Sequence, residues 1–103
     1  MRVRIVEEFW GINRRTGERS TRQTDEKTFM PVVGSIMEMP TGRRKFSVDV
    51  VDEDSVTVTV FYENNPTANK TMLITKGDSV VYRPVSRDGG YKYTIFYEDE
   101  INH

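Results

Sequence analysis

Residues 56–62 read Val-Thr-Val-Thr-Val-Phe-Tyr, and this stretch decides the fold class. Its even positions are apolar and its first two odd positions are threonines, so apolar side chains recur at every second residue. Side chains alternate between the two faces of a β-strand, and β-branched residues favour strands. The pattern therefore predicts a strand with one buried face.

A second stretch, residues 94–99 (Thr-Ile-Phe-Tyr-Glu-Asp), closely repeats residues 59–64 (Thr-Val-Phe-Tyr-Glu-Asn). Each follows a turn signal at a similar distance, Asp-Glu-Asp at 52–54 and Asp-Gly-Gly at 88–90. Short polar residues and glycine are typical of tight turns between strands. We therefore expect two similar β-hairpins, lying side by side in one domain.

The remaining segments add further short strands, since β-branched or alternating residues lie between turn signals at 3–12, 18–24 and 72–75. Residues 29–39 are ambiguous: four apolar residues have helical spacing, whereas a glycine and a pair of valines favour a strand or irregular structure, which we predict. The chain is thus predicted to be all-β. Six to eight short strands, built from hairpins, would form a small antiparallel β-sandwich or a partly open β-barrel.

The composition fits one domain. The chain has 103 residues, a mass of 12.0 kDa and no cysteine, so we expect a single β domain over 1–103 with a frayed acidic tail at about 99–103. The lack of cysteine excludes disulfides and thiolate chemistry. A charged N-terminus and the lack of a long apolar run predict neither a signal peptide nor a membrane span, and hence a cytoplasmic protein.

Charge is unevenly distributed along the chain, although the formal net charge is only −1. Residues 1–46 contain ten Lys/Arg and six Asp/Glu, whereas residues 47–103 contain five and ten, so the two parts carry about +4 and −5. We favour the interpretation that basic and acidic strands neighbour one another in the fold. The alternative is one basic and one acidic face, with an anionic partner on the basic face.

Aromatic doublets supply the first candidate site. Phe61 and Phe96 are expected to face outwards, because the tyrosine that follows each of them shares the core-facing parity. Phe9 and Trp10 form a third doublet, with one ring on each face. Phe61, Phe96 and one of this last pair would form a contact patch for a protein, a second copy of the chain, a sugar or a base. Alternatively, a loop or the N-terminal segment covers the rings, since monomers rarely expose contiguous apolar patches.

Two basic turns supply the second candidate site. Each places cations around a Thr-Gly pair, and the residues are Arg14, Arg15 and Arg19 in the first and Arg43, Arg44 and Lys45 in the second. If the turns converged, their guanidinium groups would bind phosphate. The alternative is two solvated hairpin ends, which we favour because the isoelectric point of 5.8 is low for a nucleic-acid-binding domain.

Metal binding and catalysis have little support in the sequence. The acidic clusters at 52–54 and 98–100 lack the ligand spacing and the glycine of a calcium loop. The only histidine is His103, at the chain end. No spacing marks a catalytic residue, so we expect no metal, no cofactor and no enzyme activity. An enzyme, or an accessory subunit of one, is the least favoured interpretation.

The sequence therefore predicts a small β-rich binding or interaction module. Its expected partner is another protein, bound through the aromatic patch, and self-association as a homodimer falls under the same prediction. Nucleic-acid or phosphate binding through the basic turns is the alternative, and no membrane association is expected.

Overall fold

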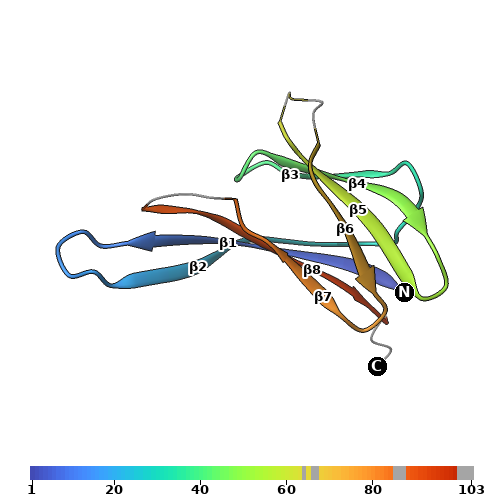
Figure 1. Cartoon of the computed structure of the whole chain (residues 1–103), viewed down its shortest axis with the longest axis horizontal. Helices are drawn as coiled ribbons and strands as arrows, with labels where there is room; N and C mark the ends of the chain where they lie inside the picture. The colour runs from blue at the N-terminus through green and yellow to red at the C-terminus, as the bar shows by residue number, and fades with distance from the viewer. Residues whose placement is uncertain (64, 66–67, 85–87, 100–103) are drawn as a thin grey trace.

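Eight β-strands and no helix make up the part of the chain that the structure describes (Figure 1). The structure is a computed structural model, and it describes residues 1–63, 65, 68–84 and 88–99. The strands are β1 (Arg2–Ile12), β2 (Arg19–Phe29), β3 (Ile36–Met39), β4 (Arg44–Val51), β5 (Ser55–Tyr62), β6 (Ala68–Thr75), β7 (Ser79–Tyr82) and β8 (Gly89–Glu98).

The strands form two four-stranded antiparallel sheets that pack on one another as a β-sandwich. Sheet I has the strand order β2-β1-β8-β7, and sheet II has the order β3-β4-β5-β6. Among the described residues no strand pairing joins one sheet to the other. The predicted all-β class is confirmed, and of the two predicted architectures the fold is the sandwich.

The alternating side chains form the core between the inner faces of the two sheets. Val56, Val58 and Val60 of β5 are at most 1% exposed, and Tyr93 of β8 is fully buried. Burying a side chain of this size contributes about 1.5–3 kcal/mol. The ring of Phe46 on β4 lies 5.3 Å from that of Tyr93, so the two sheets meet directly.

The two similar hairpins of the domain belong to different sheets. The β4–β5 hairpin belongs to sheet II and the β7–β8 hairpin to sheet I. Each buries its apolar side against the other, so their polar sides face away from each other. Tyr62 is also less buried than its parity suggests: it is 40% exposed, because it lies at the very end of β5.

The ambiguous segment 29–39 contains no helix, as predicted. Residues 30–35 between β2 and β3 are irregular. The backbone N–H of Gly34 donates to the carbonyl of Val48 at 2.9 Å, and the N–H of Val48 donates to the carbonyl of Ser35 at 3.0 Å. Gly34 has a φ of 88°, which glycine adopts readily and a helix does not contain.

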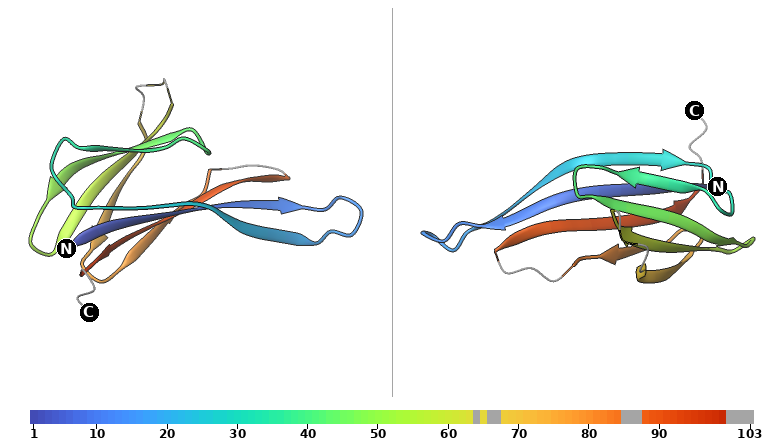
Figure 2. Two further views of the ribbon diagram at one scale, coloured as in Figure 1. Left: turned by 180° about the vertical axis from the view of Figure 1, so that it is seen from behind. Right: turned by 90° about the horizontal axis from the view of Figure 1, so that it is seen from above.

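The β1–β2 hairpin extends past the end of sheet II, as both views of Figure 2 show. Thr24 is an extra residue in β2, because Glu7 pairs with Asp25 and the next residue, Glu8, pairs with Gln23. We call the part of the hairpin beyond this bulge, residues 8–23, the arm. The arm contributes to the elongated shape of the chain, which measures 48 × 37 × 19 Å.

β1 itself does not change face at the bulge. The apolar residues of β1 change parity after Ile5, which fits either a change of face or cover on both faces, and the register of β1 with β8 runs without a break. Phe9 therefore lies on the inner face with Tyr91, while Trp10 lies on the outer face and is nevertheless only 8% exposed. One ring on each face of the arm is the arrangement that the doublet predicted.

Several sequence expectations concern the ends of elements. β7 ends at Tyr82, before Pro84, and is an edge strand of sheet I. This position suits proline, because proline cannot donate a hydrogen bond within a sheet.

Residues 64, 66–67, 85–87 and 100–103, which include most of the predicted tail, lie outside the described residues. Within the described ranges, no helix has the length and apolar character needed to cross a lipid bilayer.

Candidate functional site

The turn between β3 and β4, residues 40–43, is the centre of the candidate site. The backbone N–H of Arg43 donates to the carbonyl of Pro40 at 3.2 Å and closes the turn. The carbonyl of Arg43 accepts a hydrogen bond of 2.8 Å from the N–H of Glu63, which ties the turn to the end of β5. Arg43 has a φ of 56°, an uncommon value for a residue with a side chain. Its backbone is thus held from two sides while its side chain is exposed.

A buried carboxylate anchors this turn to sheet I. Glu7 on β1 is fully buried, and its Oε2 accepts hydrogen bonds from the N–H of Gly42 at 3.1 Å and from the hydroxyl of Tyr93 at 2.8 Å. Its Oε1 accepts a hydrogen bond of 2.6 Å from the hydroxyl of Thr24, the bulge residue. Such donors are what a buried charge requires. Burial, reinforced by the hydrogen bond to Glu7, raises the pKa of Tyr93 well above its ordinary value.

Gly42 is buried in this network, and a side chain would not fit there. A Cβ atom added to Gly42 would lie 1.9 Å from the Tyr93 hydroxyl oxygen and 2.7 Å from Oε2 of Glu7. Glycine allows the turn backbone to approach the carboxylate closely. The same residue thus turns the chain and fixes the position of the two arginines that follow it.

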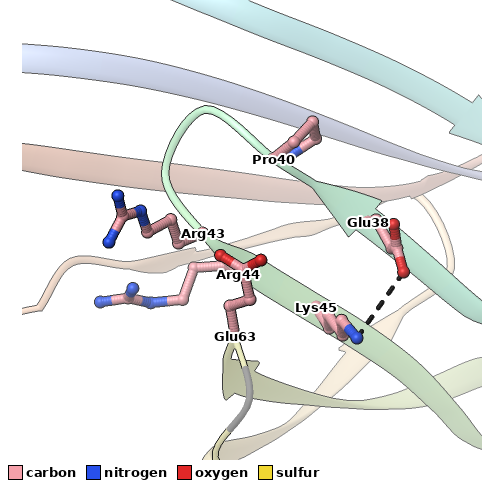
Figure 3. A pocket seen from close by; sticks show the side chains of 6 residues that line it. All are labelled: Glu38, Pro40, Arg43, Arg44, Lys45 and Glu63. Carbon is pink, nitrogen blue, oxygen red and sulfur yellow. Dashed lines mark ion pairs between the residues drawn. The ribbon is translucent and has the colours of Figure 1, made fainter.

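Two hollows flank these arginines. The larger, of about 470 Å³, lies between the turn, the end of β5 and the start of β8. The smaller, of about 90 Å³, is shown in Figure 3, where Arg43 and Arg44 extend to the same side and Lys45 turns towards Glu38, 3.7 Å away. We call the larger hollow the notch; its lining residues are Thr41, Gly42, Arg43, Arg44, Tyr62 and Tyr91.

Arg44 is held in position inside the notch. Its guanidinium carbon lies 4.5 Å from the centroid of the Tyr62 ring, a cation–π contact, and its Nη1 donates to the carbonyl of Gly42 at 3.1 Å. Its Nε is buried and has no hydrogen-bond partner among the described residues. The guanidinium is thus fixed by its neighbours, and the buried Nε offers no surface to a ligand.

Aromatic rings continue the notch onto the inner face of the arm. The rings of Tyr91 and Phe9 meet edge to face, with their centroids 5.3 Å apart. Arg22 pairs with Phe9 across the β1–β2 ladder, and its guanidinium carbon lies 5.8 Å from the Phe9 centroid. Residues that are directly paired in a sheet share one side of it. The rings of Tyr62, Tyr91 and Phe9 thus follow one another, with the arginines of the turn at one end and Arg22 at the other.

Trp10 occupies the opposite, outer face of the arm. The guanidinium carbons of Arg19 and Arg83 lie 5.5 and 5.6 Å from its ring, one on β2 and one just beyond β7. Its indole Nε1 is buried without a partner among the described residues. Phe9 and Trp10 were alternative members of one predicted patch, and only Phe9 adjoins the notch.

The fold does not bring Phe61 and Phe96 together. Phe61 lies opposite Lys45 on the outer face of sheet II, and Phe96 lies on the outer face of sheet I. Arg4 covers Phe96, with its guanidinium carbon 4.0 Å from the ring centroid. The two sheets of a sandwich turn their inner faces to one another, so these outer faces point in opposite directions. One patch containing both rings is therefore not formed.

The two basic turns also lie apart. The turn of the arm is at the far end of the β1–β2 hairpin, away from the β3–β4 turn, in every view of Figures 1 and 2. The predicted cations in this part of the chain are all exposed, and they are Arg14, Arg15 and Arg19. Arg14 forms an ion pair with Asp88. Of the second group, Arg43 and Arg44 line the notch, whereas Lys45 lines only the smaller hollow.

The arginines around the notch have no carboxylate within ion-pair distance in the described part of the chain, although Arg43 and Arg44 also line the smaller hollow with two carboxylates. Among the described residues, Arg22, Arg43 and Arg44 form no ion pair with a carboxylate. Glu38 and Glu63 line the smaller hollow rather than the notch. The notch therefore combines unpaired cations with accessible aromatic rings.

Several of these residues escaped the sequence analysis. A signal for Glu7 exists, because it shares its parity with Val3 and Ile5, and a charged residue at a core-facing position requires partners. The link from Glu7 to Gly42 has no such signal, since only the packing of the two sheets brings them together. The inner-face position of Arg22 depends on the bulge in β2, which the sequence does not locate.

Comparisons with protein-family models, with curated proteins and with solved structures found no match. Within the described residues, no group of three or more His, Cys, Asp or Glu side chains is arranged to hold a metal ion. The assignment of a function therefore depends on the geometry of the notch.

Proposed function

We propose that the protein is a binding module that takes an anionic ligand in the notch. One observation carries the proposal: three arginines without a carboxylate partner among the described residues lie at a hollow of about 470 Å³. Arg43 and Arg44 line this hollow, and Arg22 lies beside it on the arm. A guanidinium group presents a planar fork of donors that matches phosphate and carboxylate oxygens.

The fixed position of Arg44 supports the proposal. Its guanidinium is already stacked on Tyr62 and bonded to the carbonyl of Gly42, so less side-chain entropy is lost when a ligand binds. The Glu7 network in turn holds the turn that carries Arg44. A site whose cations are preorganised by the fold binds more tightly than the same cations on a mobile loop.

This proposal takes the place of the aromatic patch as the leading interpretation, because Phe61 and Phe96 face in opposite directions. The net charge of −1 does not conflict with it, since binding depends on the local distribution of charge. A partner protein would be recognised here through acidic or phosphorylated side chains rather than through a broad apolar surface.

Isothermal titration with a soluble inorganic polyphosphate at low ionic strength tests the proposal. The informative variant is R22Q/R43Q, which removes two exposed cations, one beside the notch and one from its lining. The matched control is R2Q/R4Q, which removes the same charge from the outer face of sheet I. We expect the first variant to bind about tenfold more weakly, about 1.4 kcal/mol, and the control to bind like the native protein. Equal weakening in both variants, or no binding by the native protein, would contradict the proposal.

A further inference from the structure

The row of rings along the notch and the arm, with arginines at both ends, indicates a class of ligand. We infer that the anion is a single-stranded nucleic acid, with its bases on the rings and its phosphates on the arginines. This inference rests on the proposed function and specifies its ligand. Proteins that bind single strands without sequence preference combine a positively charged groove with aromatic side chains on which bases stack.

The rings lie in the order that such a ligand requires. Tyr62 on sheet II and Tyr91 on β8 both line the notch, and the ring of Phe9 on the arm contacts that of Tyr91. Tyr62 is 40% exposed, and the other two rings are half-buried. Each ring thus presents part of its surface to a ligand while its position is fixed by packing. An acidic peptide would use the arginines but would leave these rings without a function.

The cations flank the row of rings at both ends. Arg44 stacks on Tyr62, Arg43 lines the same hollow, and Arg22 flanks Phe9. Neutralising three phosphates of a single strand gives a salt dependence with a slope of about −2 in log K against log salt concentration. The inference therefore makes a quantitative prediction about how binding falls with salt.

The distribution of charge favours a single strand over a duplex. Glu38 and Glu63 line the smaller hollow beside the notch, together with Arg43 and Arg44, and Glu18 lies at the turn of the arm. The positive surface is therefore a narrow strip rather than a broad face. A segment of a few nucleotides fits a strip of this kind, whereas a duplex would meet these carboxylates.

Fluorescence anisotropy of a labelled oligothymidine of about ten nucleotides, at low salt, tests the inference. Its competitors are an abasic oligonucleotide of the same length, a duplex of the same length, inorganic polyphosphate and oligoglutamate. We expect the abasic strand, which keeps the phosphates and lacks the bases, to compete at least about tenfold more weakly than oligothymidine. We also expect the duplex, the polyphosphate and the peptide to compete more weakly than oligothymidine.

The variants Y62A and Y91A test the stacking directly. We expect each to weaken oligothymidine binding about fivefold or more. The affinity for polyphosphate should stay within about twofold in Y91A, and in Y62A it should fall less than the affinity for oligothymidine, because Tyr62 also positions Arg44. F96S, on the outer face of sheet I, is the control ring and should change neither affinity. If Y91A fails to fold, as judged by circular dichroism, then the exposed Tyr62 carries the test alone.

The outcomes separate this inference from the proposed function. Equal competition by the abasic strand, or stronger competition by the duplex or the peptide, overturns the single-strand assignment and leaves the notch as a binding site for another anion. If polyphosphate binds and oligothymidine does not, only the assignment fails. If none of these anions binds, both the assignment and the proposed function fail.

Discussion

Two pairs of arginines in this fold differ in whether a carboxylate lies within ion-pair distance. Arg2 and Arg4 on the outer face of sheet I both pair with Glu98, with nitrogen–oxygen distances of 3.2 and 2.7 Å, and Arg4 also pairs with Glu26 at 3.1 Å. Arg43 and Arg44 at the β3–β4 turn form no ion pair among the described residues. The first pair is neutralised within the protein, and the second keeps its charge.

The difference shows that the surroundings of a cation, and not the number of cations, identify a binding surface. Arg4 covers the Phe96 ring and completes an outer face that needs no ligand. Arg44 stacks on Tyr62 and forms no ion pair with a carboxylate of the described residues. Exposed ion pairs contribute little to stability, so the first pair is a modest structural feature. The second pair is placed by a buried network that costs free energy to assemble.

The largest expected effect follows from breaking the anchor of the second pair. In Gly42→Ala the new Cβ would collide with the Tyr93 hydroxyl, so we expect the free energy of unfolding to fall by about 3 kcal/mol. Urea denaturation followed by circular dichroism measures it. Thr41→Ala, at the exposed neighbouring position, should stay within about 0.5 kcal/mol of the native protein. A similar loss in both variants would show that Gly42 has no special position.

A smaller effect is expected from Tyr93→Phe, which removes one of the three donors to the Glu7 carboxylate. We expect a loss of about 2 kcal/mol at neutral pH. Burial raises the pKa of Tyr93 above that of the unfolded chain, about 10. Neutral Tyr93 thus stabilises the fold below that pH, and this contribution is lost as the pH rises above it. Alkaline denaturation should therefore be shallower in Tyr93→Phe than in Tyr62→Phe, and parallel curves would contradict the account.

The neutralised pair should give a still smaller effect. Hydrogen bonds from Arg4 and then Arg2 hold the pKa of Glu98 below its usual range. This carboxylate therefore contributes stability above the unfolded value of 4.5, and the contribution is lost as the pH falls through the lower folded value. We expect Glu98→Gln to cost about 1 kcal/mol or less at neutral pH and to make acid denaturation less steep. Thermal melts between neutral and acidic pH measure both, and a loss as large as that of Gly42→Ala would reverse the order of the two regions.

The fold was predictable where one periodicity determines burial. The alternation in β5 and β8 predicts both strands, their hairpins and their buried faces, because a half-buried strand requires a period of two. The same alternation does not say whether two hairpins are neighbours in one sheet or face each other across a core. Phe61 and Phe96 were therefore placed on one patch, although a sandwich sends them to opposite outer faces.

The candidate site was predictable only in part. Arg43 and Arg44 follow a turn signal, so their exposure at a hairpin end could be anticipated. Their relation to Tyr91 on β8 and to Glu7 on β1 could not, because it arises from packing between residues far apart in the chain. A pattern along one strand carries no information about which side chain of the other sheet it will meet.

The central claim is that the cations around the notch, and not those on the outer face of sheet I, neutralise the anionic ligand. The most direct test is the salt dependence of oligothymidine affinity in the native protein, R22Q/R43Q and R2Q/R4Q. We predict slopes in log K against log salt concentration of about −2, about −0.7 and about −2, since each phosphate contact contributes about −0.7. Equal slopes in R22Q/R43Q and the native protein, or a reduced slope in R2Q/R4Q alone, would contradict the account.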